Sequence, residues 1–117
     1  MTRFDERGAA TAELALSIPL LVSLTIGLVW LLGIGVAQVQ MVDAAREAAR
    51  ATARGDAVGE AVAAGEKVAP GSTVSVRVAD WTVVATAVGA VGPPGGLLGF
   101  LPEVHLQARA VTAAESP

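Results

Sequence analysis

Cysteine is absent from the 117 residues of this chain. Disulfide bonds, thiolate nucleophiles and cysteine-based metal sites are therefore excluded, and cysteine usage says nothing about the redox compartment. Tyrosine is also absent, and the only aromatic side chains are two phenylalanines and two tryptophans. Alanine, valine, glycine and leucine supply nearly all of the apolar character, so a soluble core would be built from small side chains. Such a core is weakly stable alone, which indicates a need for a partner or a membrane.

The chain also lacks a concentration of charge of one sign. Its formal net charge is −3 and the charges are not clustered, so the electrostatic footprint of a nucleic-acid-binding protein is missing. His105 is the only histidine, and the alternation around it predicts an exposed position on a strand. No Ser/His/Asp grouping, metal-ligand spacing or phosphate-binding loop accompanies it. We therefore expect no enzyme activity, no cofactor and no metal site.

The main positive feature is an apolar run near the N-terminus, with no ionisable residue from Leu14 to Val42. As a helix, its most apolar part, residues 14–37, would be roughly 36 Å long at about 1.5 Å per residue. This length exceeds a hydrocarbon core of about 30 Å, so the run predicts a membrane-spanning helix with some tilt. Small surfaces for contact between such helices are predicted at Gly27, Gly33 and Gly35.

After Val42 the chain becomes polar without a helix breaker. Alanines recur at helical spacing on one side and arginines on another, which predicts that the membrane helix continues into water as a short amphipathic helix. Gly55 suits its C-terminal cap, and Asp56 is expected to cap a second short helix over residues 57–69.

From residue 72 the apolar period changes to two, and candidate strands cover residues 73–79, 81–88 and 103–111. Three strands with one apolar face can cover a helix, so the predicted fold is α+β with a small antiparallel sheet of about three strands. Between the last two strands lies an apolar loop, residues 97–101. We expect this loop to cover the small core; the alternative is an exposed patch that meets a partner subunit or the lipid surface.

Three interpretations of the N-terminus compete. A secretory signal peptide could be cut after Gly35-Val36-Ala37 to release a soluble domain that starts near Gln38, but its apolar region is typically only about 7–15 residues long. A plain single-pass anchor explains the length of the run. Neither explains why Gly8 and Glu13 bracket four small or neutral residues directly before it.

That spacing resembles the type IV prepilin signature, in which a short charged leader ends in glycine and an acid is the fifth mature residue. The stretch "RGAATAELALSIPLL" and the later "AAREAAR", residues 44–50, further resemble the TadE-like family of minor pilins and pseudopilins of the tight-adherence (Tad) pilus. The resemblance implies a cut between Gly8 and Ala9 by a prepilin peptidase. It also implies that Glu13 meets the terminal amine of a neighbouring subunit, since a carboxylate buried in an apolar bundle needs a compensating charge.

The resemblance implies a structural minor pilin or pseudopilin that helps to initiate or support pilus assembly. Its expected partners are the prepilin peptidase, other pilin subunits, the Tad membrane platform and the lipid bilayer of the bacterial cytoplasmic membrane. Four regions are expected: a cytoplasmic leader (1–8), a transmembrane helix (9–42), an extracytoplasmic helical region (43–69) and a small β-rich region (70–117). Two arginines precede the apolar run and three follow it within residues 46–54. Charge counting alone therefore slightly favours the opposite orientation, with the N-terminus outside and residues 43–117 in the cytoplasm. The alternative function is an unprocessed single-pass protein with a small extracytoplasmic binding module.

Overall fold

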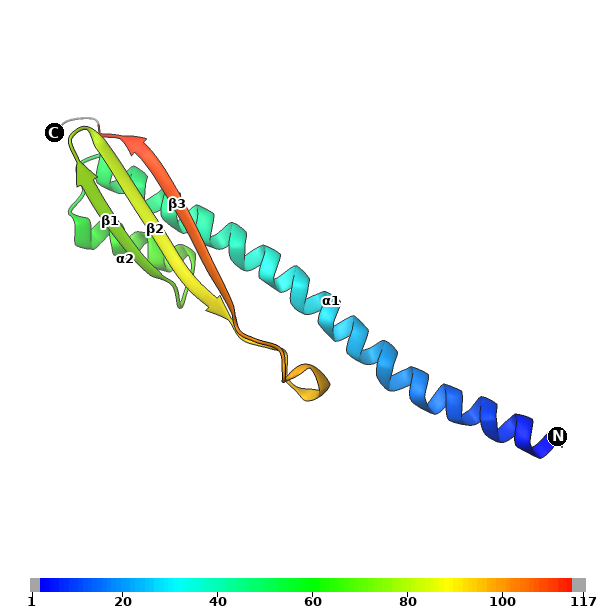
Figure 1. The fold of residues 1–117 in the computed structure, drawn as a ribbon. Coiled ribbons are helices and arrows are strands. Elements are labelled where there is room, and N and C mark those ends of the chain that lie inside the picture. The colour runs from blue at the N-terminus through cyan, green and yellow to red at the C-terminus, as the bar shows by residue number, and fades with distance from the viewer. Residues whose placement is uncertain (1–2, 115–117) are drawn as a thin grey trace.

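Two helices, a short 3-10 helix and three strands make up the fold. In chain order these are α1 (Arg3–Ala53), α2 (Val58–Val68), β1 (Thr73–Ala79), β2 (Thr82–Val91), η1 (Gly96–Leu98) and β3 (Val104–Ala113). The computed structural model describes the backbone of residues 3–114 and the side chains of residues 6–114. Met1 and Thr2 of the predicted leader, and the last three residues of the predicted β-rich region, lie outside the described residues. Helix α1 makes the molecule long and narrow, 84 × 18 × 17 Å (Figure 1), and the predicted α+β class is confirmed.

Helix α1 continues from the apolar run into the amphipathic extension, as predicted, and it also includes residues of the N-terminal segment from Arg3 onward. Pro19 lies inside it without ending it. The helix ends at Ala53, and Gly55 follows two residues later with a φ of 97°, which is available to glycine at little cost. The Gly55 amide donates to the Thr52 carbonyl at 3.0 Å, and the Asp56 amide donates to the Ala51 carbonyl at 3.1 Å. These two bonds form a Schellman motif, so the predicted glycine cap is confirmed.

Helix α2 is present where the second short helix was predicted, but its N-terminal cap is different. Ala57, not Asp56, occupies the N-cap position, and no side chain caps the helix there. The Asp56 carboxylate instead accepts a bond from the Arg54 guanidinium at 3.2 Å on the exposed surface. The predicted capping role of Asp56 is therefore wrong, because the preceding Schellman turn directs this side chain back toward Arg54.

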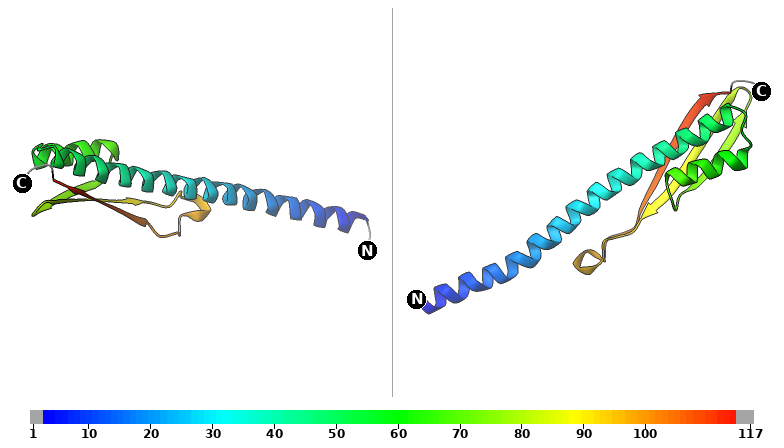
Figure 2. Two further views of the ribbon diagram at one scale, coloured as in Figure 1. Left: turned by 90° about the horizontal axis from the view of Figure 1, so that it is seen from above. Right: turned by 180° about the vertical axis from the view of Figure 1, so that it is seen from behind.

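The three strands form one antiparallel sheet in the order β1-β2-β3. Both helices lie on the same face of this sheet (Figure 2). Val83, Ala85 and Ala87 of β2 point toward the helices and are fully buried, whereas Val88 on the opposite face is exposed. His105 is exposed on the outer face, as the alternation predicted. The sheet thus buries one face and leaves the other uncovered.

The core lies between the sheet and the C-terminal part of α1. Alanines dominate it, and Val83 is the largest fully buried side chain. The small side chains allow close approach: a Cβ atom added at Gly65 of α2 would lie 2.9 Å from the Ala44 carbonyl oxygen of α1. The core therefore accommodates only residues 41–53 of α1 closely, and the preceding apolar run extends beyond it.

The apolar loop does not cover this core, so that expectation is wrong. Residues 92–103 extend past the end of the sheet and lie beside the apolar run of α1 (Figures 1 and 2). Leu98 and Leu101 are partly covered there, whereas Leu97 and Phe100 are 70% and 79% exposed. The core is already filled by alanine and valine side chains, so the loop packs on the helix instead.

Candidate functional site

The apolar part of α1 has a surface that the rest of the chain leaves largely uncovered. Leu16 and Leu32 are 75% and 71% exposed, and none of the most apolar 18-residue stretch is buried. The helix is long and apolar enough to cross a membrane. A core helix of a soluble protein would be mostly buried, so this exposure favours contact with lipid or with other apolar helices.

The predicted cleavage position lies in the first turns of α1. Gly8 and Ala9 are exposed, and no atom lies within 4 Å of the position that a Cβ of Gly8 would occupy. Residues 6–12 pack against no other described element, so only the helical hydrogen bonds hold them in place. Helix ends without tertiary contacts unwind at low cost, which leaves this segment accessible to a protease.

Glu13 is exposed one turn further along the helix. Its backbone carbonyl accepts a bond from the Ser17 hydroxyl at 2.7 Å. Among the side chains that the structure describes, Arg54 and Asp56 form the only ion pair, so the Glu13 carboxylate pairs with no cation of residues 6–114. A partner for this charge would have to come from another molecule or from a new N-terminus.

The three glycines that were predicted to favour helix contact do not share one side of α1. At about 100° per residue, Gly33 and Gly35 point roughly 160° apart, because their separation is two residues. A Cβ added at Gly27 would lie 3.4 Å from Leu98 Cδ1 of the loop, whereas nothing lies within 4 Å at Gly33 or Gly35. The Gly27 surface is therefore used by this chain itself, and only the other two remain open to a neighbouring helix.

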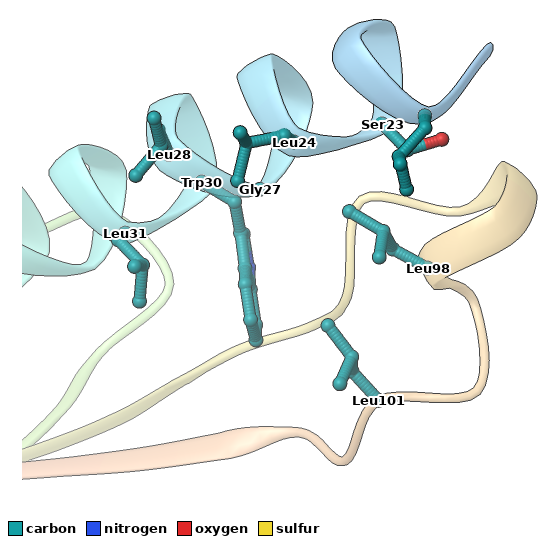
Figure 3. A pocket seen from close by; sticks show the side chains of 9 residues that line it. Ser23, Leu24, Gly27, Leu28, Trp30, Leu31, Leu98 and Leu101 are labelled. Atoms are coloured by element: carbon teal, nitrogen blue, oxygen red, sulfur yellow. The ribbon is translucent and has the colours of Figure 1, made fainter. Parts of the chain in front are cut away.

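A strongly apolar groove lies between α1 and the loop. It is lined by Leu20, Ser23, Leu24, Gly27, Leu28, Trp30, Leu31, Leu98 and Leu101. Figure 3 shows Leu98 and Leu101 pointing from the loop toward the helix, with the Trp30 ring reaching from the helix to the loop beside them. The Trp30 indole donates to the Gly92 carbonyl at 2.8 Å. The sequence offered no signal for this contact between residues 62 positions apart, beyond the unexplained apolar character of the loop.

The described residues contain no arrangement typical of catalysis. No three His, Cys, Asp or Glu side chains come close enough together to hold a metal ion within the searched range. A second, smaller hollow lies between α1 and strand β3. Arg46 and Arg50 line it on the helix side, and Ala110, Val111 and Thr112 line it on the strand side. It brings together no nucleophile and base.

A family model of known proteins matches part of the chain. Residues 8–50 match the family model described as TadE-like protein. This family is structural, is associated with the Tad pilus and is not known for catalysis. The match begins at Gly8 and ends at Arg50, so it covers the same segment that carries the sequence resemblance and confirms it there. No curated protein and no solved structure matches the chain.

Proposed function

We propose that this chain is a minor pilin or pseudopilin of a Tad-type pilus assembly and secretion system. It is anchored in the bacterial cytoplasmic membrane by α1 and helps to initiate or support assembly of the pilus. A prepilin peptidase removes residues 1–8 on the cytoplasmic side, and the sheet lies outside the membrane. Its partners are the peptidase, other pilin or pseudopilin subunits and the Tad membrane platform.

One observation carries this proposal: the family match begins at the residue after which the cut is expected. The uncovered apolar surface of α1 supports it, since a pilin helix needs either lipid or neighbouring helices around it. The compact part of the molecule lies at the opposite end of α1, so the first turns are left free for an enzyme (Figure 1). The cut would therefore break no contact of the core.

The chemistry of the new terminus supports a role for Glu13. After the cut, Ala9 carries an α-ammonium group four residues before Glu13, and residues four apart lie on the same side of a helix. The carboxylate then lies near the positive end of the helix dipole, which favours a negative charge. The same ammonium group can reach the Glu13 of an adjacent subunit when helices pack in a stagger. Cleavage therefore creates a cation close to Glu13, which forms no ion pair with the side chains of residues 6–114.

N-terminal sequencing of the protein purified from its native membrane tests the processing step. The proposal expects a mature N-terminus at Ala9, and replacement of Gly8 by valine should leave the leader attached because the side chain crowds the scissile bond. A start at Met1 would instead support an unprocessed single-pass protein with an outer binding module. A start near Gln38 would identify a secreted soluble domain, and either result would overturn the proposal.

Replacement of Glu13 by alanine tests the assembly step. The mature protein should still begin at Ala9, but its incorporation into the pilus machinery should fall strongly because the new ammonium group loses its partner. Glu6→Ala is the matched control, since it removes the same charge from the leader that is cut away. Pilus number by electron microscopy, together with the subunit content of sheared pili, gives the measurement. Normal piliation in Glu13→Ala would contradict the assigned role.

The orientation is tested separately with a tag at the C-terminus. Protease added to cells with a permeabilised outer envelope should remove the tag, while the cytoplasmic membrane stays intact. Protection of the tag would place the sheet in the cytoplasm, in agreement with the slight excess of arginines that follow the apolar run. That result would exclude the proposed topology.

A further inference from the structure

The loop between β2 and β3 has the composition of a membrane-inserting segment. No ionisable residue occurs between Asp80 and Glu103, and the loop itself contains Leu97, Leu98, Phe100 and Leu101. Leu98 and Leu101 point toward α1, whereas Leu97 and Phe100 stay 70% and 79% exposed. Large apolar side chains at the tip of a loop are unfavourable in water, so their exposure indicates an apolar surrounding.

Two contacts fix the level of the loop along α1. The Trp30 indole donates to the Gly92 carbonyl at 2.8 Å, where the chain leaves β2. Further down the helix, Leu98 Cδ1 lies 3.4 Å from the position that a Cβ of Gly27 would occupy. Both helix residues belong to the segment that is long and apolar enough to cross a membrane. The loop therefore lies beside the membrane-spanning part of the chain.

The depth follows from the rise of the helix. A hydrocarbon core of about 30 Å corresponds to about 20 helical residues, so a core that begins at Leu14 ends near Gly33. For a helix along the membrane normal, Trp30 lies about 5 Å inside that boundary and Gly27 about 9 Å inside it. Tryptophan is enriched at this level of a bilayer, where its ring is apolar and its N–H finds a polar partner.

A hydrogen bond between α1 and the sheet lies above the same boundary. The Gln38 side-chain amide donates to the Gln107 carbonyl of β3 at 3.2 Å, five residues beyond Gly33. The sheet thus starts where the membrane would end, and only the loop reaches below it. A loop that shares its level with a membrane helix, and that carries no charge, is continuous with the lipid-contacting surface of that helix.

The backbone of the loop suits an interfacial position. Its three prolines, Pro93, Pro94 and Pro102, carry no N–H group that would need a partner. Turn bonds join the amides of Leu98, Gly99 and Leu101 to carbonyl groups within the loop. The remaining amides still need water or lipid headgroups, which excludes the middle of the hydrocarbon and favours its edge.

We propose that the β2–β3 loop is a second membrane contact of this protein. It inserts Leu97 and Phe100 into the acyl chains of the leaflet on the sheet side, next to the headgroups, while Leu98 and Leu101 hold it against α1. The occupant of this surface is lipid rather than a second copy of the chain. This inference rests on the proposed membrane span of α1. It means that the sheet lies directly on the membrane surface, and that the loop must leave the lipid when a subunit is withdrawn.

Because the chain has no cysteine, single-cysteine variants report the surroundings of chosen residues directly. Phe100→Cys tests the loop, Val29→Cys on the exposed side of the span is the lipid control, and Ser75→Cys on the outer face of the sheet is the water control. The full chain is placed in phosphatidylcholine nanodiscs at one copy per disc. A charged, water-soluble maleimide then measures the reactivity of the unlabelled thiol, and brominated phosphatidylcholine measures the quenching of an attached fluorophore.

The inference expects slow maleimide reaction and strong quenching at Phe100→Cys, as at Val29→Cys, with the opposite behaviour at Ser75→Cys. Fast reaction and weak quenching at Phe100→Cys, while Val29→Cys stays in lipid, would overturn the loop insertion and leave the span intact. If the Phe100→Cys thiol reacts fast in nanodiscs with one copy but slowly in vesicles with many copies, a second copy covers the loop. That result would also overturn the proposed insertion into lipid. A water-exposed Val29→Cys would instead contradict the membrane span and the proposed function.

Discussion

Replacement of Gly65 by alanine should loosen the contact between α1 and α2. The added Cβ would lie 2.9 Å from the Ala44 carbonyl oxygen, 3.2 Å from Ala48 Cβ and 3.4 Å from Val74 Cγ1. Overpacking of this kind costs about 1–3 kcal/mol, and the upper end applies because the nearest atom belongs to the backbone of a packed helix. Alanine recovers about 1 kcal/mol through its higher helix propensity. The expected net loss of stability is about 2 kcal/mol.

Amide hydrogen exchange measures this loss in the full chain in nanodiscs. Peptides that cover β2 report the opening of the core, because Val83, Ala85 and Ala87 are fully buried there. A loss of about 2 kcal/mol lowers their protection about 30-fold when exchange follows the opening equilibrium. Exchange within residues 14–33 of α1 should not change, since these residues contribute no buried side chain to the core.

Gly59→Ala is the matched control for this prediction. It makes the same chemical change in the same helix, but nothing lies within 4 Å of its Cβ position. Only the gain in helix propensity remains there, so the free energy of opening should rise by up to about 1 kcal/mol and exchange should slow. Opposite effects of the two substitutions would establish that the close approach of the helices, rather than glycine as such, is needed at residue 65. Stabilisation by both would refute the reasoning.

Two further substitutions test the core and the end of α1 by the same measurement. Val83→Ala removes two carbons from the largest fully buried side chain and should lower the stability by about 2 kcal/mol. Val84→Ala on the outer face should lower it clearly less. Equal losses of stability would contradict the assigned sheet faces. Gly55→Ala places a side chain at a φ of 97° and should lower the stability by about 1 kcal/mol, with faster amide exchange at the start of α2. An unchanged exchange rate there would show that the Schellman turn is dispensable.

The sequence predicted the bounds of a strand correctly where apolar and polar residues alternate strictly. The first strand was predicted over residues 73–79 and has those bounds, because its alternation is strict and a turn follows it. The second strand extends past its predicted end at residue 88 to Val91. Gly89 and Ala90 are weak strand formers, but they pair with Leu106 and His105 of β3. Here the partner strand, which no local pattern reveals, decides the end of the element.

The apolar loop was placed wrongly for a different reason. Leucine, phenylalanine and glycine in a loop are compatible with a protein core, a partner surface or lipid, and composition alone does not separate these. The Trp30–Gly92 hydrogen bond decides the position, and it joins residues 62 apart in the sequence. The roles of Gly8, Ala9 and Glu13 stay predictions, because the groups that would act on them belong to other molecules or form only after cleavage.

The two ends of α1 differ in their contacts, so a change at the N-terminal end does not affect the folded core at the other end. Residues 41–53 hold the sheet and α2 through alanine contacts, whereas residues 6–12 pack against no other described element. Unwinding of residues 6–12 would thus leave the core unaffected, as the proposed cut after Gly8 requires. The loop adds a contact between these ends, at the level of Gly27 and Trp30. A subunit that is pulled from the membrane by its neighbours would therefore keep its folded sheet, and the steps that resist withdrawal would be the transfer from lipid of the apolar helix and of the loop beside it.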